Sequence, residues 1–441
     1  MAPAECTSFV GARLSGGRCF QFDPVTLDEE MSVRLTVLAP LLAAIPGVAS
    51  AEPMAFNVAL ERAAANAPSV LANTAGVEAS RSSAIAAGQL PDPTLSVGID
   101  NFPITGPPAF TFNHDDMTMA RVGIEQAFPN PAKRRAQRGR AQAEIGAAEA
   151  GLAVETQNVR LETALAWVDL YYAKRRLAQL DMLDESLGDL QATVSARLAS
   201  GSARPSQALE PDQLRAAVND RRSELTAEVA KAKARLARLT GDPDADVSGD
   251  PPVIDVDGPA LRAGLAALPR LQALDAEARV ADADTELARA DKRPDWRVGT
   301  SYGRRDPAFG DMVSVTVSID LPFFSRKRQD PLIAARESEA SRARLLREAG
   351  ERDLLAALDG DLADHAMHHQ RLMNARQTLV PLAKRRAELD RASYAAGRLD
   401  LGSALLSSLN LAEAEVDALA READVARDAI RINFTYGEVR P

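Results

Sequence analysis

The feature that most limits the fold is an internal duplication. Three blocks of the first half of the chain recur, in the same order, in the second half at offsets of 201, 193 and 196: residues 66–98 in 267–299, 119–129 in 312–322, and 198–209 in 394–405. Three matches in one order indicate that a single structural unit occurs twice. A chain built in this way cannot fold around one central core of unrelated elements.

Each copy has the same pattern: a helix, a strand, a loop, a second strand, a very long helix, a glycine turn and a long returning helix. The first copy is predicted over 54–240 and the second over 258–434, with a short tail at 435–441. Between them, residues 241–257 are rich in Pro, Gly and Asp and have no helical period, which is typical of a linker. The expected class is mainly α with a small β part.

Four segments alternate apolar and polar residues with the period of two that strands require. They predict strands over 94–101, 118–128, 295–302 and 312–321. One interpretation is a half-buried sheet with one wet face. The other is a transmembrane barrel, apolar toward lipid and polar toward a lumen.

The barrel interpretation requires several chains to pool their strands. Four strands cannot enclose a lumen, and an open strand edge is not tolerated in lipid. On this interpretation the charged residues of the polar face point into the lumen: Arg121, Glu125, Asp295, Arg297 and Asp320.

The helices are too long for a compact domain. No proline interrupts the 70 residues from 131 to 200 beyond Pro131 itself, which as one helix would reach about 105 Å. The second copy matches it except for Pro381, and Asn130 and Ser325 are predicted to cap the two helices. Pro211 is expected to kink the returning helix of the first copy. Such hairpins alone would also suit a structural coiled-coil protein.

Proline and basic residues mark both points where a strand gives way to a long helix. Proline ends a strand because it cannot donate to the ladder. If the helices start at a membrane boundary, six basic residues lie at the level of the lipid headgroups: Lys133, Arg134, Arg135, Arg326, Lys327 and Arg328. The alternative is a merely solvated helix start.

The first fifty residues predict export. Residues 31–51 have a basic start, a short apolar run and a small-residue cleavage site, which indicates a signal peptide. Residues 1–30 are acidic where a basic region is expected, so they are interpreted as a start-site artefact or a disordered leader. Both cysteines, Cys6 and Cys19, lie in this segment, so the mature chain is predicted to have no disulfide and no lipidated cysteine.

The sequence carries no catalytic motif, no Rossmann or P-loop pattern and no H-E-x-x-H. We therefore expect no enzyme activity and no cofactor. The net charge of −10 argues against nucleic acid as a partner. His365, His368 and His369 share a helical face and are weak candidates for a metal site; a polar stripe on a helix is the simpler interpretation.

The order of these segments resembles the outer membrane factor family, the TolC-like exit channels of tripartite efflux systems. The similar stretches are 86–101, 119–134 and 392–415. The sequences of the first two are similar to the heavy-metal CzcC/CusC-type branch. The resemblance implies a homotrimer whose chains contribute four strands each to a twelve-stranded barrel, with the helices forming a periplasmic tunnel.

The resemblance also implies passive efflux across the outer membrane, with heavy-metal cations as one possible cargo. The expected partners are a periplasmic adaptor and an inner-membrane pump of the RND type. The helical tips would dock the adaptor and close the duct, through Gly201, Arg204, Gly397, Arg398 and Asp400. The competing interpretation is a soluble periplasmic coiled-coil structural protein.

Overall fold

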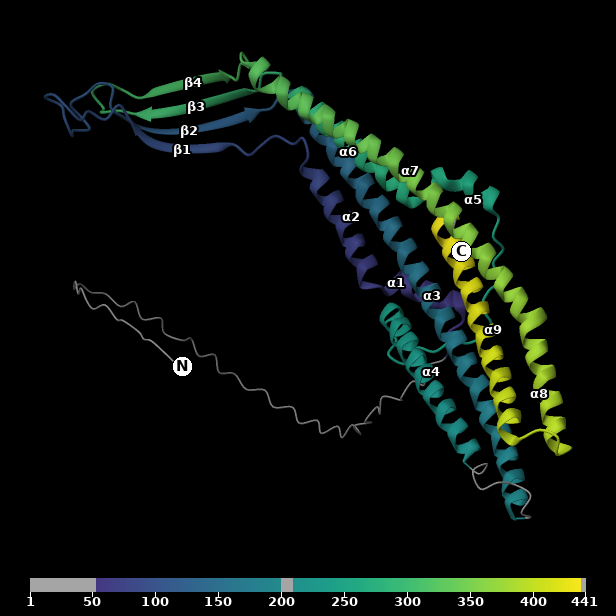
Figure 1. Cartoon of the computed structure of the whole chain (residues 1–441). Coiled ribbons are helices and arrows are strands. Elements are labelled where there is room, and N and C mark those ends of the chain that lie inside the picture. Colours follow the sequence, from purple (N-terminus) through teal and green to yellow (C-terminus); the bar gives the residue numbers. More distant parts are fainter. Residues whose placement is uncertain (1–52, 200–208, 438–441) are drawn as a thin grey trace, which may run out of the picture. The chain divides into compact units, whose positions relative to one another are not determined.

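A computed structural model describes residues 53–199 and 209–437, and in it the same order of elements occurs twice (Figure 1). The first half contains α1 (Phe56–Asn66), α2 (Pro68–Ala86), β1 (Thr94–Asp100), β2 (Met119–Phe128), α3 (Pro131–Ala199) and α4 (Glu210–Thr240). The predicted leader, signal peptide, first hairpin tip and last four residues lie outside the described residues.

The second half begins with short helices and ends with long ones. It contains α5 (Gly258–Gly264), a 3-10 turn (Leu265–Ala267), α6 (Pro269–Ala290), β3 (Trp296–Arg304), β4 (Met312–Ile319), a second 3-10 turn (Ser325–Lys327), α7 (Gln329–Asn374), a π turn (Ala375–Leu379), α8 (Val380–Ala395) and α9 (Leu401–Tyr436). All four predicted strands are therefore present, each shifted by at most two residues at an end.

The strands form one antiparallel sheet in the order β1-β2-β3-β4. Because neighbouring strands alternate in direction, the start of β1, the end of β2, the start of β3 and the end of β4 lie at one end of the sheet. The helices α2, α3, α6 and α7 are joined to the sheet at this end (Figure 1). The loops 101–118 and 305–311 lie at the opposite end.

The pairing places the apolar side chains of all four strands on one face, for example Val97 beside Val122 and Val298 beside Val317. No helix of the described chain covers this face. Its thirteen large apolar residues are each 40% to 75% exposed: Leu95, Val97, Ile99, Val122, Ile124, Phe128, Trp296, Val298, Tyr302, Val313, Val315, Val317 and Ile319. The described chain therefore does not itself bury this face, as an ordinary half-buried sheet would require.

The two hairpins show how the copies correspond in space. Leu95 pairs with Ile124 in the first hairpin, and Trp296, its counterpart at an offset of 201, pairs with Ile319 in the second. Ile319 lies 195 residues after Ile124, so the structural offset of the second strand is 195 and not the 193 of the sequence match. A slip of two residues keeps every side chain on its face, which explains why the alternating pattern did not reveal it.

α3 is a single helix of 69 residues, about 104 Å long at 1.5 Å per residue. It packs against α2, α4, α6 and α9. The main core lies where α1, α3, α4 and α9 meet around Trp167, which is fully buried and donates its indole N–H to the carbonyl of Met54 at 2.9 Å. The length of helix predicted from the proline-free run is confirmed.

The matching helix of the second copy is interrupted. The N–H of Val380 donates to the carbonyl of Ala375, five residues back, which closes a π turn immediately before Pro381. The turn adds one residue, so the offset of 195 at the sheet becomes 196 at the tip. The kink expected at Pro211 is wrong. α4 begins at Glu210, so Pro211 lies in the first turn, where a backbone N–H has no partner within the helix and its absence breaks no hydrogen bond.

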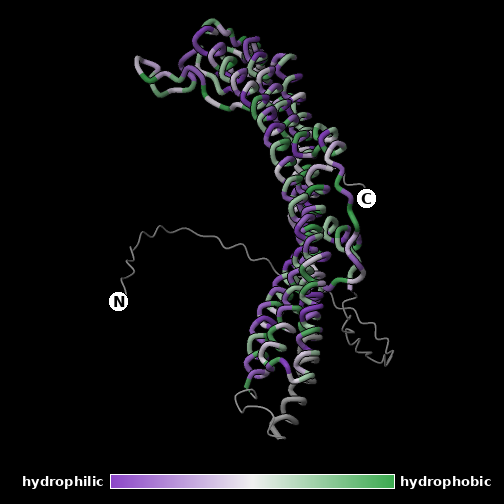
Figure 2. The backbone as a smooth tube through the Cα atoms, turned by 45° about the vertical axis from the view of Figure 1, so that its right-hand side comes forward, coloured by the Kyte–Doolittle hydropathy of each residue, from purple (hydrophilic) through white to green (hydrophobic). Residues whose placement is uncertain are grey.

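Hydrophilic and hydrophobic residues are interspersed along the helices (Figure 2). Within the described residues, no helix combines the length and the apolar character needed to span a membrane.

Asn130 connects the two copies at the base of the sheet. Its side-chain oxygen accepts the N–H of Lys133 at 2.8 Å, so the predicted cap of α3 is confirmed. Its amide nitrogen donates to the carbonyls of Ala290 and Arg293 at 3.2 and 3.3 Å, and to the carboxylate of Asp295 at 2.9 Å. Asn130 is 4% exposed; its bond to Ala290 is buried, and its other three bonds are partly buried.

The second copy has no such cap. Ser325 opens a 3-10 turn whose start has no side-chain cap, and α7 begins only at Gln329. The predicted capping role of Ser325 is therefore wrong. The strand-to-helix transition is a single buried joint in the first copy and a looser turn in the second.

We predict that Asn130→Ala lowers the free energy of unfolding by about 1–3 kcal/mol, because it removes a cap and leaves the buried carbonyl of Ala290 without this donor. Chemical unfolding in detergent, followed by circular dichroism, measures the change. Asn73→Ala is the matched control, since Asn73 is only half-buried on α2 and its amide makes one solvent-exposed bond among the described residues, to the carbonyl of Ser69. Equal losses in the two variants would contradict the role of the buried joint.

Candidate functional site

The uncovered face of the sheet is an apolar band between a pair of aromatic residues at one end and a tyrosine near the other. Phe128 and Trp296 pair directly at the end joined to the helices. Tyr302 lies near the other end of β3, six residues after Trp296, which corresponds to roughly 20 Å along a strand. Aromatic residues at both limits of an apolar band are typical of barrel strands that cross a membrane.

The opposite face of the sheet is polar and built largely from small residues. Gly123 is buried between its neighbouring strands, and a Cβ atom there would lie 3.0 Å from the hydroxyl of Ser96 and 3.1 Å from the Cβ of Ser301. At this point of β2 the face therefore has little room for a side chain larger than glycine.

Four of the five charged residues predicted for the lumen lie on or beside this face. Arg121 pairs with Asp100 at 3.1 Å, and Arg297 pairs with Asp320 at 2.6 Å. Glu125 is exposed, and no ion pair joins it to another residue of the described chain. The polar face thus carries two balanced pairs and one carboxylate.

Asp295 lies elsewhere. It precedes β3, and its carboxylate accepts the backbone N–H of Asn130 at 2.7 Å and pairs with Lys133 at 3.4 Å. Burial opposes its ionisation, but the bonds from Asn130 and the charge of Lys133 outweigh it and lower the pKa of Asp295. Asp295 is thus a component of the buried joint.

The six basic residues also divide into two groups. A hydrogen bond to Asp291 raises the pKa of Lys133, and Arg134 donates to the carbonyl of Gly88 at 2.8 Å. Gly88 has φ +66°, and a Cβ atom there would lie 2.4 Å from the carbonyl oxygen of Arg134, so only glycine fits this contact. The other four are exposed: Arg135, Arg326, Lys327 and Arg328. Their contact with lipid headgroups stays a prediction.

The described tip joins α8 to α9. Gly397 has φ +71°, the left-handed conformation that ends α8, and Asp400 caps α9 by accepting the N–H and hydroxyl of Ser403 at 2.9 and 2.8 Å. These bonds lower the pKa of Asp400. Arg398 lies in the same turn, whereas Gly201 and Arg204 fall outside the described residues.

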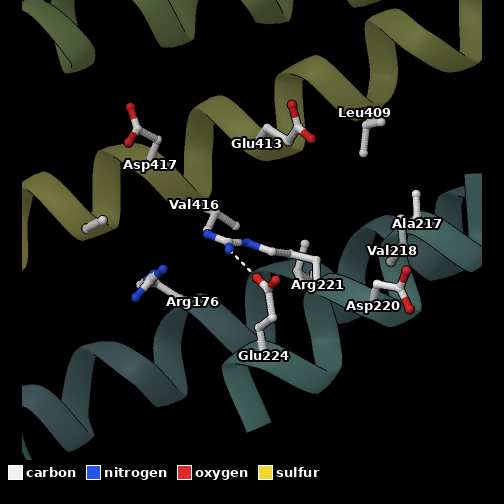
Figure 3. Close-up of a pocket in the computed structure, with 12 residues that line it drawn as sticks. Arg176, Ala217, Val218, Asp220, Arg221, Glu224, Leu409, Glu413, Val416 and Asp417 are labelled. Carbon is white, nitrogen blue, oxygen red and sulfur yellow. Dashed lines mark hydrogen bonds and ion pairs between the residues drawn. The ribbon is translucent and has the colours of Figure 1, made fainter. Parts of the chain in front are cut away.

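Near this tip, a groove of about 500 Å³ separates α4 from α9 above α3 (Figure 3). Its floor is apolar and includes the buried residues Leu180, Val218 and Val416. Its rim is charged: Arg221 and Glu224 pair on α4, and Glu413 and Asp417 lie on α9 on the other side (Figure 3). This groove could not be predicted from the sequence, because helices from both copies form it.

His365, His368 and His369 make different contacts. His368 bonds the buried carboxylate of Asp428 through Nδ1 at 2.6 Å. His365 and His369 line a different cavity beside the linker, and burial lowers the pKa of His365. Among the described residues, no group of three or more His, Cys, Asp or Glu side chains is placed to hold a metal ion.

Solved structures share this architecture. The outer-membrane channel OprN has a TM-score of 0.73 and 19% identity, over 87% of this chain and 89% of the other. CusC, described in terms of transmembrane channel formation, has a TM-score of 0.74 and 14% identity, over 87% and 92%. The outer membrane protein VceC of Vibrio cholerae has a TM-score of 0.71 and 17% identity, over 87% and 96%.

These similarities establish the fold. The chain has the TolC-like fold of outer-membrane channels, as the resemblance in the sequence led us to expect. No protein-family model matches the sequence, and no curated protein does.

Sequence reasoning found the strands and their faces but missed the joint between the copies. Asn130 was identified only as a cap, and Asp295 only as a lumen residue. A signal was present in the sequence: an asparagine and an aspartate flank the two strands that end up adjacent, and each directly adjoins a proline.

We predict that Asp295→Asn destabilises the protein at neutral pH and much less in acid. The folded pKa is below the ordinary value of about 3.9, so the contribution of Asp295 is complete above about pH 4 and is lost as the pH falls through the folded pKa. Melting temperatures of both proteins in detergent from pH 7 to pH 3 measure it. Asp291→Asn is the control, because Asp291 shares Lys133 but not Asn130. A difference in melting temperature between Asp295→Asn and the unaltered protein that does not change with pH would contradict the prediction.

Proposed function

We propose that three copies of this chain form an exit channel in the outer membrane. Each copy contributes its four strands to a twelve-stranded barrel, and the helices extend into the periplasm as a tunnel. The observation that carries the proposal is the uncovered apolar face of the sheet. A soluble protein rarely exposes so many contiguous large apolar residues, whereas lipid requires such a surface.

The polar face and the free edges support the same assembly. β1 and β4 each have one unpaired edge, and a strand edge in lipid must be paired. Closing the sheet through further copies pairs both edges and turns the small, polar residues toward a lumen. The rival proposal, a soluble coiled-coil protein, leaves both the edges and the apolar face without a partner.

We further propose that the channel works with a periplasmic adaptor and an inner-membrane pump, and conducts the cargo passively. The tips carry this part of the proposal because α3 extends about 100 Å from the sheet. The adaptor would bind the tips, and the groove between α4 and α9 offers a second surface with an apolar floor and a charged rim. Two of the similar solved structures, OprN and VceC, are described as outer-membrane proteins, which supports this location.

Membrane insertion tests the channel. The purified protein should require detergent for extraction and should give stepwise conductance in planar lipid bilayers. Val317→Arg should abolish insertion, because a charge at a lipid-facing midplane position costs about 2–4 kcal/mol, and each trimer would carry three. Thr316→Arg is the control: it lies next in sequence on the polar face and pairs with Gly299 beside Glu125. Recovery of the unaltered protein from the periplasm without detergent would sink the proposal, and equal insertion of both variants would count against the barrel.

The tip can be tested separately. We expect Asp400→Arg to abolish export while the protein still inserts into the outer membrane, because the change removes a helix cap and reverses a charge at the docking end. Asp400→Asn keeps a capping side chain, so it separates the two effects. Asp116→Arg, in the loop at the other end of the sheet, is the matched charge reversal. Resistance of a complemented deletion strain to a panel of metal cations and drugs gives the readout, and full resistance with Asp400→Arg would remove the tip from the mechanism.

A further inference from the structure

The contact between β2 and β3 is a template for the contact between copies. β2 belongs to the first repeat and β3 to the second, so their pairing joins the end of one structural unit to the start of the next. In a closed ring the end of the second unit, β4, meets the start of the first unit, β1, of the next copy. We call these two contacts seams: β2 with β3 within one chain, and β4 with β1 of the next copy. Because the units are repeats, the two seams should share one register.

The template fixes that register residue by residue. Phe128 pairs with Trp296 within the chain. The structural counterpart of Phe128, at an offset of 195, is Phe323, and the counterpart of Trp296, at an offset of 201, is Leu95. We propose that β4 pairs with β1 of a second copy so that Phe323 lies opposite Leu95. This inference rests on the proposed channel and specifies how its subunits join.

The register matches apolar residues that the single chain leaves exposed. With Phe323 opposite Leu95, Leu321 lies opposite Val97 and Ile319 opposite Ile99. Leu321 is 55% and Phe323 79% exposed, although both follow the last residue of β4. The register gives these two residues strand partners, so in the proposed assembly β4 extends to Leu321, and to Phe323 once the turn at 321–323 opens.

Pro322 does not obstruct this extension. The N–H of Asp320 donates to the carbonyl of Asp295 at 3.0 Å, so it points toward β3. Successive N–H groups of a strand point to opposite edges. Those of Ile319 and Leu321 therefore point to the free edge, and the N–H that Pro322 lacks would have pointed toward β3. The N–H of Phe323 donates to the carbonyl of Leu321 at 2.9 Å in the single chain, so this turn must open before Phe323 can pair across the seam.

Disulfide cross-linking tests the register. In the proposed seam, Asp320 faces Gly98 of the next copy in a pair that is not hydrogen-bonded, where Cα atoms are about 4.5 Å apart and within the disulfide range. A side chain at Gly98 meets nothing within 4 Å. The background should carry Cys6→Ser and Cys19→Ser, so that the introduced cysteines are the only ones.

We expect the Gly98→Cys, Asp320→Cys double variant to form reducible covalent trimers in the membrane. Each single variant should run as a monomer on denaturing gels. Within one chain β1 and β4 are separated by three strand spacings, about 14 Å, so a disulfide between these positions joins two copies. Asp100→Cys with Ser318→Cys tests the same register at a second pair, should the first impair folding.

The matched control shifts the register by two residues. Gly98→Cys with Ser318→Cys is the pair required by the sequence offset of 193, and in the proposed seam its Cβ atoms lie about 7–8 Å apart. It should cross-link several-fold less. Preferential cross-linking of this control would overturn the register.

The remaining outcomes separate the inference from the proposed function. If the reduced variants insert and conduct but neither register cross-links on oxidation, the pairing of β4 with β1 is wrong while the channel stands. If the unaltered protein is a soluble monomer, the channel fails and the seam fails with it.

Discussion

The hydrogen bonds of Asn130 hold the rest of the structure in place. One side chain caps the longest helix, and the same side chain binds the segment between α6 and β3 of the other repeat. Helix direction, strand pairing and the contact between repeats are therefore set at one buried point. Because α3 continues for 69 residues from this joint, a small change of angle here would displace the tip by many ångströms.

The sheet depends on that joint, yet it is incomplete in a single chain. A helix hairpin can satisfy its own backbone, but a four-stranded sheet leaves two edges unpaired and, in this protein, leaves its apolar face uncovered. Adding strands of the same kind until the sheet closes would pair both edges and leave the apolar face on the outside of the barrel, where lipid can cover it. The internal duplication makes this possible, since each chain already contains one unit-to-unit contact in the pairing of β2 with β3.

The parts that could be predicted from the sequence follow from local rules. Alternation located all four strands and their faces, and the absence of proline gave the length of α3. What failed depended on tertiary context. Ser325 does not cap because α7 starts four residues later, and Pro211 does not kink because α4 starts just before it. The offset between β2 and β4 was wrong by two residues, because alternation fixes only the face of a strand and leaves its register to pairing.

The two repeats pair their strands in the same way, but the residues at their strand-to-helix transitions differ in how many hydrogen bonds they can make. This difference has a consequence for assembly. At the joint within the chain, Asn130 offers two side-chain donors and an acceptor, and each is bonded. Its counterpart at an offset of 195 is Ser325, whose hydroxyl can donate one hydrogen bond. The proposed seam between copies therefore lacks this polar joint and would depend more on apolar residues such as Phe323, which is exposed in the single chain. A chain built in this way can fold its own repeats together first and join other copies once lipid surrounds the apolar face.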